Sequence, residues 1–169
     1  KPDFRWANFW SVGGSWLISK ENFFKAAWVS ELKLRTSYGQ VGNDAGIGYY
    51  PYQALYALGF NNALEPGIRQ SALPNDSITW ESAKSFDLAL EFSLLKNRIS
   101  GSVEYYNRKT DALIFGVQQP LSLGAYTLNK NIGAMVNKGI EINLTGDVIK
   151  NKNFTWSLGV NATTLKNEI

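Results

Sequence analysis

Residues 80–108 limit the possible folds more than any other part of the chain. Apolar side chains occupy every second position of 86–94, and the same alternation restarts at 99 after the short segment 95–98. Successive side chains of a strand point to opposite faces, so the pattern predicts a hairpin with one apolar and one polar face. Both arms are longer than an ordinary strand of about 5–6 residues. They match the roughly 9–11 residues that cross a bilayer in a β-barrel, so we interpret the chain as part of a membrane barrel.

The same alternation recurs along the chain and predicts an all-β fold. We expect about six long strands in an antiparallel up-and-down meander. The connections alternate in length, and outer-membrane barrels have short periplasmic turns and long extracellular loops. The two long connections, 42–79 and 117–138, are therefore predicted to be extracellular. The expected strands cover residues 6–18, 31–41, 80–95, 98–116, 139–149 and 153–166.

The two faces of these strands suggest different surroundings. Lys33 and Arg35 share one face of a strand, which would be costly against lipid but suits a water-filled lumen. The carboxylates Asp87, Glu91, Glu104, Glu141 and Asp147 are expected on the same lumen side. The apolar positions are expected to face lipid, and the candidates are Leu88, Leu90, Phe92, Ile142, Leu144, Leu158 and Val160.

Two connecting segments carry aromatic side chains. Ser19 could cap a short helical turn through residues 24–28, with Phe23, Phe24 and Trp28 either at a membrane interface or in ordinary packing. The long connection 42–79 is rich in Gly and Pro, and connections of this length are usually functional or disordered. Its tyrosines could stack on sugars or fill pockets in a partner, or could pack only within the loops. These tyrosines are Tyr49, Tyr50, Tyr52 and Tyr56.

Composition argues against several classes of function. The chain has no Cys and no His, so Cys-ligated zinc, disulfides and the commonest general base are excluded. The carboxylates are dispersed along a polar wall, and we expect no enzymatic activity and no cofactor or metal site. A net charge of +3 is too small to indicate nucleic-acid binding. No apolar run approaches 18 residues, which excludes a transmembrane helix but not a barrel. Since 14% of residues are aromatic, a soluble carbohydrate-binding β-sandwich remains the main alternative.

Several phrases of the sequence occur together in a known family. These are LKLRTSYGQVGN at 32–43, the segment 78–110 with its Trp80-Glu81 and Tyr105-Tyr106 pairs, NIGAMVNKGIEINL at 131–144, and FTWSLGVNATTLKNEI at 154–169. As a set they resemble the SusC/RagA family of TonB-linked, or TonB-dependent, outer-membrane transporters of the Bacteroidota. The match lies in the later half of the family's barrel.

This resemblance implies a barrel of about 22 strands with a plug in its lumen, of which the chain forms a minority of the wall. It further implies import of oligosaccharides or peptides across the Gram-negative outer membrane. The partners implied are a SusD-like surface lipoprotein and TonB, which would act through a plug and a TonB box outside this chain. Both ends look cut from a longer protein. A passive or secretion-associated barrel is the remaining alternative, and the substrate itself is not specified by the sequence.

Overall fold

The computed structural model describes residues 6–45, 48–123 and 127–169. Within them, regular structure is β-strand apart from two short 3-10 helices, η2 (Ile18–Lys20) and η3 (Leu121–Leu123). No helix in these ranges is long and apolar enough to cross a membrane. The described residues divide into two units, one comprising 10–40, 84–109 and 136–169 and the other comprising 6–9, 41–45, 48–83, 110–123 and 127–135.

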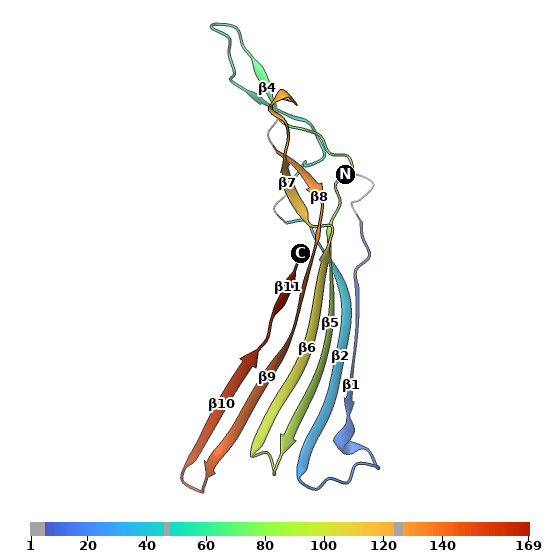
Figure 1. Cartoon of the computed structure of the whole chain (residues 1–169), viewed down its shortest axis with the longest axis vertical. Helices are drawn as coiled ribbons and strands as arrows, with labels where there is room; N and C mark the ends of the chain where they lie inside the picture. The colour runs from blue at the N-terminus through green and yellow to red at the C-terminus, as the bar shows by residue number, and fades with distance from the viewer. Residues whose placement is uncertain (1–5, 46–47, 124–126) are drawn as a thin grey trace. The chain divides into compact units, whose positions relative to one another are not determined.

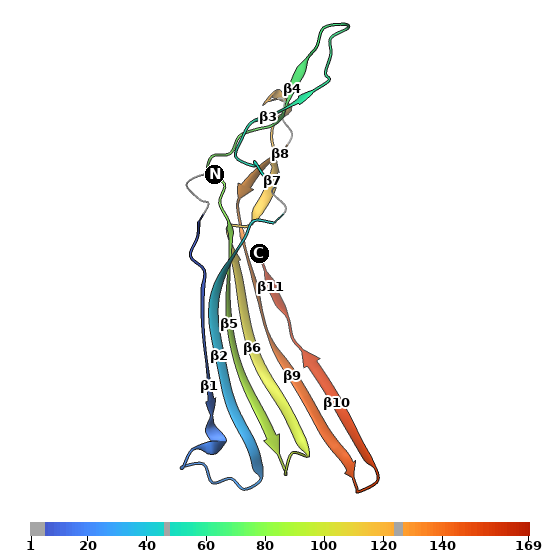
Figure 2. The same cartoon turned by 180° about the vertical axis from the view of Figure 1, so that it is seen from behind.

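A single sheet dominates the first of these units. Its strands follow the order β1-β2-β5-β6-β9-β10, which is also their order in the sequence. The short β11, which follows β10 in the chain, also pairs with β9. Figures 1 and 2 show these strands side by side from both directions. The predicted antiparallel meander is confirmed. The strands are β1 (Trp10–Leu17), β2 (Val29–Asn43), β5 (Glu81–Leu94), β6 (Ile99–Asp111), β9 (Ala134–Lys150), β10 (Thr155–Thr163) and β11 (Lys166–Glu168).

Three short connections lie at the same end of this sheet, those between β1 and β2, β5 and β6, and β9 and β10 (Figure 1). The β5–β6 turn is conformationally costly, since Leu95, Lys96 and Asn97 have φ angles of 52°, 59° and 65°. Left-handed backbone costs a residue with a side chain about 1–2 kcal/mol. The Leu95 N–H donates a hydrogen bond to the Trp28 carbonyl at 2.8 Å. The neighbouring β1–β2 connection therefore helps to hold this strained turn in place.

The pairing of β9 with β10 contains a β-bulge. Trp156 pairs with Ile149 and Ser157 with Asp147, which leaves Val148 without a partner of its own. The alternation expected for 139–149 is therefore interrupted at Val148. Two consecutive apolar residues, 148 and 149, oppose the single Trp156, as a bulge allows.

The second unit contains two small sheets, one within the predicted connection 42–79 and one formed by the end of the predicted strand 98–116 and part of the connection 117–138. β3 (Leu55–Leu58) pairs with β4 (Ile68–Ala72), and β7 (Ile114–Gln118) pairs with β8 (Thr127–Asn131). The connections 42–79 and 117–138 are thus partly ordered as hairpins. Their strands have only 4 or 5 residues, too short for the alternation on which the prediction relied.

The predicted strand 98–116 is two strands in the structure. β6 ends at Asp111, Ala112 has a φ of 57°, and β7 begins at Ile114. A residue in the left-handed conformation changes the direction of an extended chain, and the side chain of Ala112 gives no indication of that conformation. The expected strand therefore stops well before residue 116.

Other boundaries also differ from those expected. β1 begins only at Trp10, β9 is longer than 139–149 at both ends, and 153–166 is divided between β10 and β11. Ser19 lies inside η2 and does not cap it, because its buried hydroxyl oxygen has no hydrogen-bond partner. The expected helical turn through 24–28 is replaced by tight turns, one closed by the Phe24 N–H donating to the Glu21 carbonyl at 3.0 Å.

Candidate functional site

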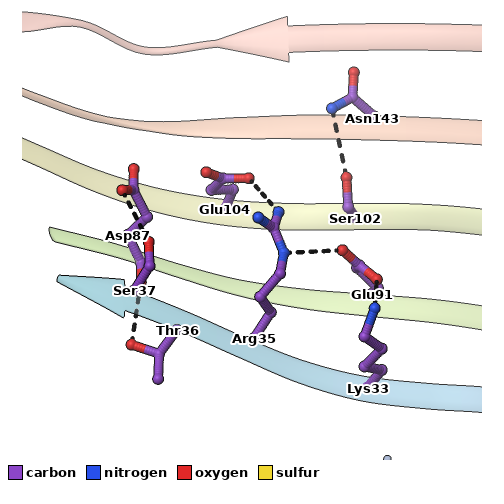
Figure 3. A network of polar contacts seen from close by, with 9 residues as sticks. All are labelled: Lys33, Arg35, Thr36, Ser37, Asp87, Glu91, Ser102, Glu104 and Asn143. Atoms are coloured by element: carbon purple, nitrogen blue, oxygen red, sulfur yellow. Dashed lines mark hydrogen bonds and ion pairs between the residues drawn. The ribbon is translucent and has the colours of Figure 1, made fainter. Parts of the chain in front are cut away.

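A network of ion pairs joins β2, β5 and β6 on the polar face of the sheet (Figure 3). The Lys33 Nζ lies 3.0 Å from one carboxylate oxygen of Glu91, and the Arg35 Nε lies 3.1 Å from the other. Arg35 also donates through a terminal nitrogen to Glu104 at 3.1 Å. One guanidinium therefore bridges carboxylates on two further strands. The structure brings together the cations and two of the carboxylates that the sequence placed on this face.

Hydrogen bonds extend this polar face in both directions (Figure 3). The Ser37 hydroxyl donates to a carboxylate oxygen of Asp87 at 3.3 Å, and the other oxygen of Asp87 is buried without a hydrogen-bond partner. On the opposite side, the Asn143 amide donates to the Ser102 hydroxyl at 3.4 Å. Polar contacts thus reach from β2 across to β9.

The other two predicted lumen carboxylates lie elsewhere on the sheet. Asp147 pairs with Lys150 at 2.7 Å and accepts a hydrogen bond from the Ser157 hydroxyl at 2.8 Å, beside the bulge. Glu141 lies opposite Thr163 in the β9–β10 pairing. Within the described ranges, no group of acidic side chains is arranged to hold a metal ion.

A close backbone approach fixes the end of β10 against β9. The Thr164 N–H donates to the Ile140 carbonyl at 2.9 Å, and the Ile140 N–H donates to the Thr164 hydroxyl at 3.0 Å. The Thr164 carbonyl accepts a hydrogen bond from the buried Tyr106 hydroxyl at 3.3 Å. A Cβ at Gly139 would overlap that carbonyl oxygen and would lie 2.7 Å from the Tyr106 hydroxyl. Only glycine leaves room for this contact.

The opposite face of the sheet is apolar, and its side chains form rows across the strands. Val160 on β10 pairs with Leu144 on β9. A Cβ at Gly101 on β6 would lie 2.9 Å from the Phe92 ring of β5 and 3.3 Å from the Leu144 methyl group. These side chains therefore converge on one face. Of the seven predicted lipid-facing side chains, Phe92 is half-buried, and the exposed fractions of the others range from 37% for Leu90 to 55% for Val160.

The four tyrosines lie in the second unit. Tyr49 is 94% exposed, and Tyr50 and Tyr56 are also exposed. Tyr52 is half-buried, and its hydroxyl accepts a hydrogen bond from the Gln53 side chain at 3.4 Å. Three of the four rings are thus available for contact with a ligand or partner, and that role stays a prediction.

Sequence reasoning missed a set of side chains that join distant segments of the second unit. One carboxylate oxygen of Glu81 accepts the Ile114 N–H at 2.8 Å, and the other accepts the Asn43 side-chain amide at 2.9 Å. Beside it, the ring of Trp80 packs edge-on against Phe9, with centroids 6.4 Å apart. The Trp-Glu pair stood out only through the family resemblance, because a single Glu next to a loop gives no pattern of its own.

Comparison with known proteins places this architecture in a family. A family model described as "TonB dependent receptor-like, beta-barrel" matches residues 2–168. TonB-dependent receptor P39 of Formosa agariphila is 34% identical over 97% of the chain, and TonB-dependent receptor SusC of Bacteroides thetaiotaomicron is 34% identical over 99% of it. A solved structure titled as the RagAB peptide importer in the "closed-closed" state superposes with a TM-score of 0.88 at 31% identity over 98% of the chain.

The chain spans 16% of the P39 receptor, 17% of SusC and 18% of the matching chain in the importer structure. The resemblance to SusC and RagA noted in the sequence is confirmed by these matches. Since the family model extends over nearly the whole sequence, the chain belongs to the TonB-dependent receptor-like β-barrel family.

Proposed function

We propose that the chain is part of the wall of a SusC-like TonB-dependent importer in the Gram-negative outer membrane. The observation that carries the proposal is a single meander whose polar face holds the ion pairs of Arg35 and whose other face is apolar and uncovered. A wall between lipid and a water-filled lumen needs this division. Transport, rather than enzymatic activity, is the role that such a wall serves.

The long connections are proposed to lie outside the cell. Three short connections share one end of the sheet, and barrels of this class place short turns in the periplasm. Segments 44–80 and 112–133 would then be extracellular, where a SusD-like lipoprotein would bind. TonB would act through a plug and TonB box in parts of the protein outside this chain.

Oligosaccharides or peptides are the proposed substrates. One matching structure is titled a peptide importer, which supports the peptide alternative. Exposed tyrosine rings such as Tyr49 and Tyr50 support either class, because a flat amphipathic ring can stack on a sugar or pack against a peptide.

The described sheets do not suit the soluble β-sandwich, in which a second sheet would cover the apolar face. The large sheet of the first unit is single, and Leu144, Leu158 and Val160 on that face are exposed. A passive or secretion-associated barrel would share this wall, so a functional measurement has to distinguish it from an importer.

Uptake by the full-length protein in its native cell tests the proposal. We expect labelled oligopeptides or labelled oligosaccharides to accumulate only when TonB is present and the proton-motive force is intact. A strain lacking the gene controls for other routes of entry. Gene-dependent uptake that survives both loss of TonB and an ionophore would identify a passive barrel. Absence of gene-dependent uptake for both substrate classes would overturn the import proposal.

A further inference from the structure

Asn131, the last residue of β8, joins three segments of the second unit. Its side-chain oxygen accepts the Thr79 N–H at 2.8 Å, and its side-chain nitrogen donates to the Thr79 carbonyl at 2.8 Å and to the Ala112 carbonyl at 2.9 Å. The pair of bonds to Thr79 reproduces the exchange that two backbones make in an antiparallel ladder. The Asn131 side-chain amide therefore links the two long connections in the way that a backbone pair links two strands.

Asn75 makes a second link between the same connections. Its side-chain nitrogen donates to the Asn129 carbonyl at 2.5 Å, while its oxygen accepts the Ser77 N–H at 3.0 Å. Asn75 is only 8% exposed, and its neighbour Ile78 is 4% exposed. Loss of a hydrogen-bond partner destabilises a buried polar group more than an exposed one, so breaking this link should cost more free energy than breaking an exposed hydrogen bond.

The Glu81 carboxylate supplies a third link, through the Ile114 N–H at the start of β7. The β3–β4 hairpin, by contrast, is closed by local contacts, such as the Phe60 N–H donating to the Gly67 carbonyl at 3.2 Å. The bonds between the connections therefore gather at the segments 75–81 and 112–131.

We propose that Asn131 is a positioning residue that makes 75–81 and the paired strands β7 and β8 open and close as one cooperative body. We call this body the loop platform. Its use in transport rests on the proposed function, since it would set the base from which the extracellular loops meet a lid or substrate. The coupling itself needs no substrate, TonB or lid, so it can fail or hold independently of import.

Hydrogen exchange of the full-length barrel in detergent, followed by mass spectrometry, tests the coupling with a double-mutant cycle. Asn75→Asp keeps the acceptor for Ser77 but sets an oxygen against the Asn129 carbonyl. Asn131→Asp keeps the acceptor for Thr79 but loses the donors to two carbonyls. The reporter is the amide of Ile114, which donates to Glu81. Because Ile114 lies opposite Asn131 in the β7–β8 register, the effect of Asn75→Asp on its exchange rate is compared within each Asn131 background.

We expect Asn75→Asp to speed exchange at Ile114 roughly tenfold when Asn131 is intact, because loss of a buried hydrogen bond weakens the whole platform. In the Asn131→Asp background, the same change should leave the Ile114 rate unaltered. Asn61→Asp is the matched control. Among the described residues, the Asn61 side chain accepts a bond from the Gly67 N–H at 3.3 Å, and Asp retains that acceptor.

Three results would overturn the proposal. An unchanged Ile114 rate in Asn75→Asp alone would show that the two connections move independently. Equal acceleration with and without Asn131 would show that the coupling runs through other residues. A tenfold effect from Asn61→Asp would likewise attribute the change to added charge rather than to the link.

Discussion

Gly139→Ala is expected to destabilise the barrel wall through one backbone contact. The added methyl group would occupy the position of the Thr164 carbonyl oxygen and crowd the Tyr106 hydroxyl. Neither group can yield freely, since the oxygen belongs to the backbone and the Tyr106 side chain is 8% exposed. Thr164 must therefore move away from β9.

The magnitude follows from the hydrogen bonds that this movement breaks. Thr164 exchanges two bonds with Ile140, and its carbonyl accepts a third from Tyr106. At a net value of about 1 kcal/mol each, their loss costs about 3 kcal/mol. Replacing glycine within a strand returns about 0.5–1 kcal/mol of backbone entropy. The expected net loss of stability is therefore about 2 kcal/mol.

Urea unfolding of the full-length protein in lipid vesicles, followed by tryptophan fluorescence, measures this loss. Gly146→Ala on the same strand is the matched control, because its Cβ would meet only the Arg98 carbonyl at 3.8 Å and the Ile99 side chain at 4.0 Å. We expect that control to be neutral or slightly stabilising. If the two variants unfold at the same urea concentration, the overlap at Gly139 does not determine stability and the reasoning is wrong.

Two further substitutions test the faces and the loop. Leu90→Arg should lower the free energy of unfolding by about 2–4 kcal/mol near the bilayer midplane, whereas Ser100→Arg on the polar face should lower it far less. Equal losses of stability in the same urea titration would refute the lipid-facing placement of Leu90. Joint replacement of Tyr49 and Tyr50 by Ala should leave the barrel assembled but weaken either substrate uptake or binding of the SusD-like lipoprotein about tenfold. The control Leu64→Ala changes a side chain that is 96% exposed and should affect neither. Wild-type binding and uptake in the tyrosine variant would leave those rings without a functional role.

The division of the sheet into faces could be predicted because it depends only on the two-residue period of a strand. Leu144 and Val160 were placed on one face from alternation alone, and the register pairs them directly. Arg35 and Glu91 were likewise assigned to a common polar side, and they form an ion pair. Such assignments need no knowledge of which strands are neighbours.

Interruptions of the period could not be predicted, because they arise from backbone geometry rather than side-chain type. Ala112 adopts a left-handed φ of 57° although alanine has no preference for it. β6 pairs with strands of the large sheet, whereas β7 pairs with β8 in a small sheet. The break between them follows from these different pairing partners. The short β3 and β4 strands were missed for a related reason, since 4 or 5 residues do not establish a period.

The hydrogen bonds of the Asn131 and Asn75 side-chain amides could not be predicted from the sequence either. Asn131 and Asn75 look like ordinary turn residues, and asparagine is common in turns because its side chain bonds to nearby backbone. Their role depends on Thr79 and Asn129, each more than fifty positions away from its partner. A pattern within one sequence window cannot reveal a bond of that span.

The bulge opposite Trp156 has a consequence for how the wall can change length. Removing one residue from a regular strand exchanges the two faces for every residue beyond the deletion. Deletion of Leu144, for example, would turn the neighbouring polar side chains of β9 toward its apolar side. Loss of Val148 would instead place Asp147 next to Ile149 and restore simple alternation, with both still opposite their present partners on β10. Residue 148 is thus the point in this strand where a single-codon deletion can be accepted without reversing inside and outside.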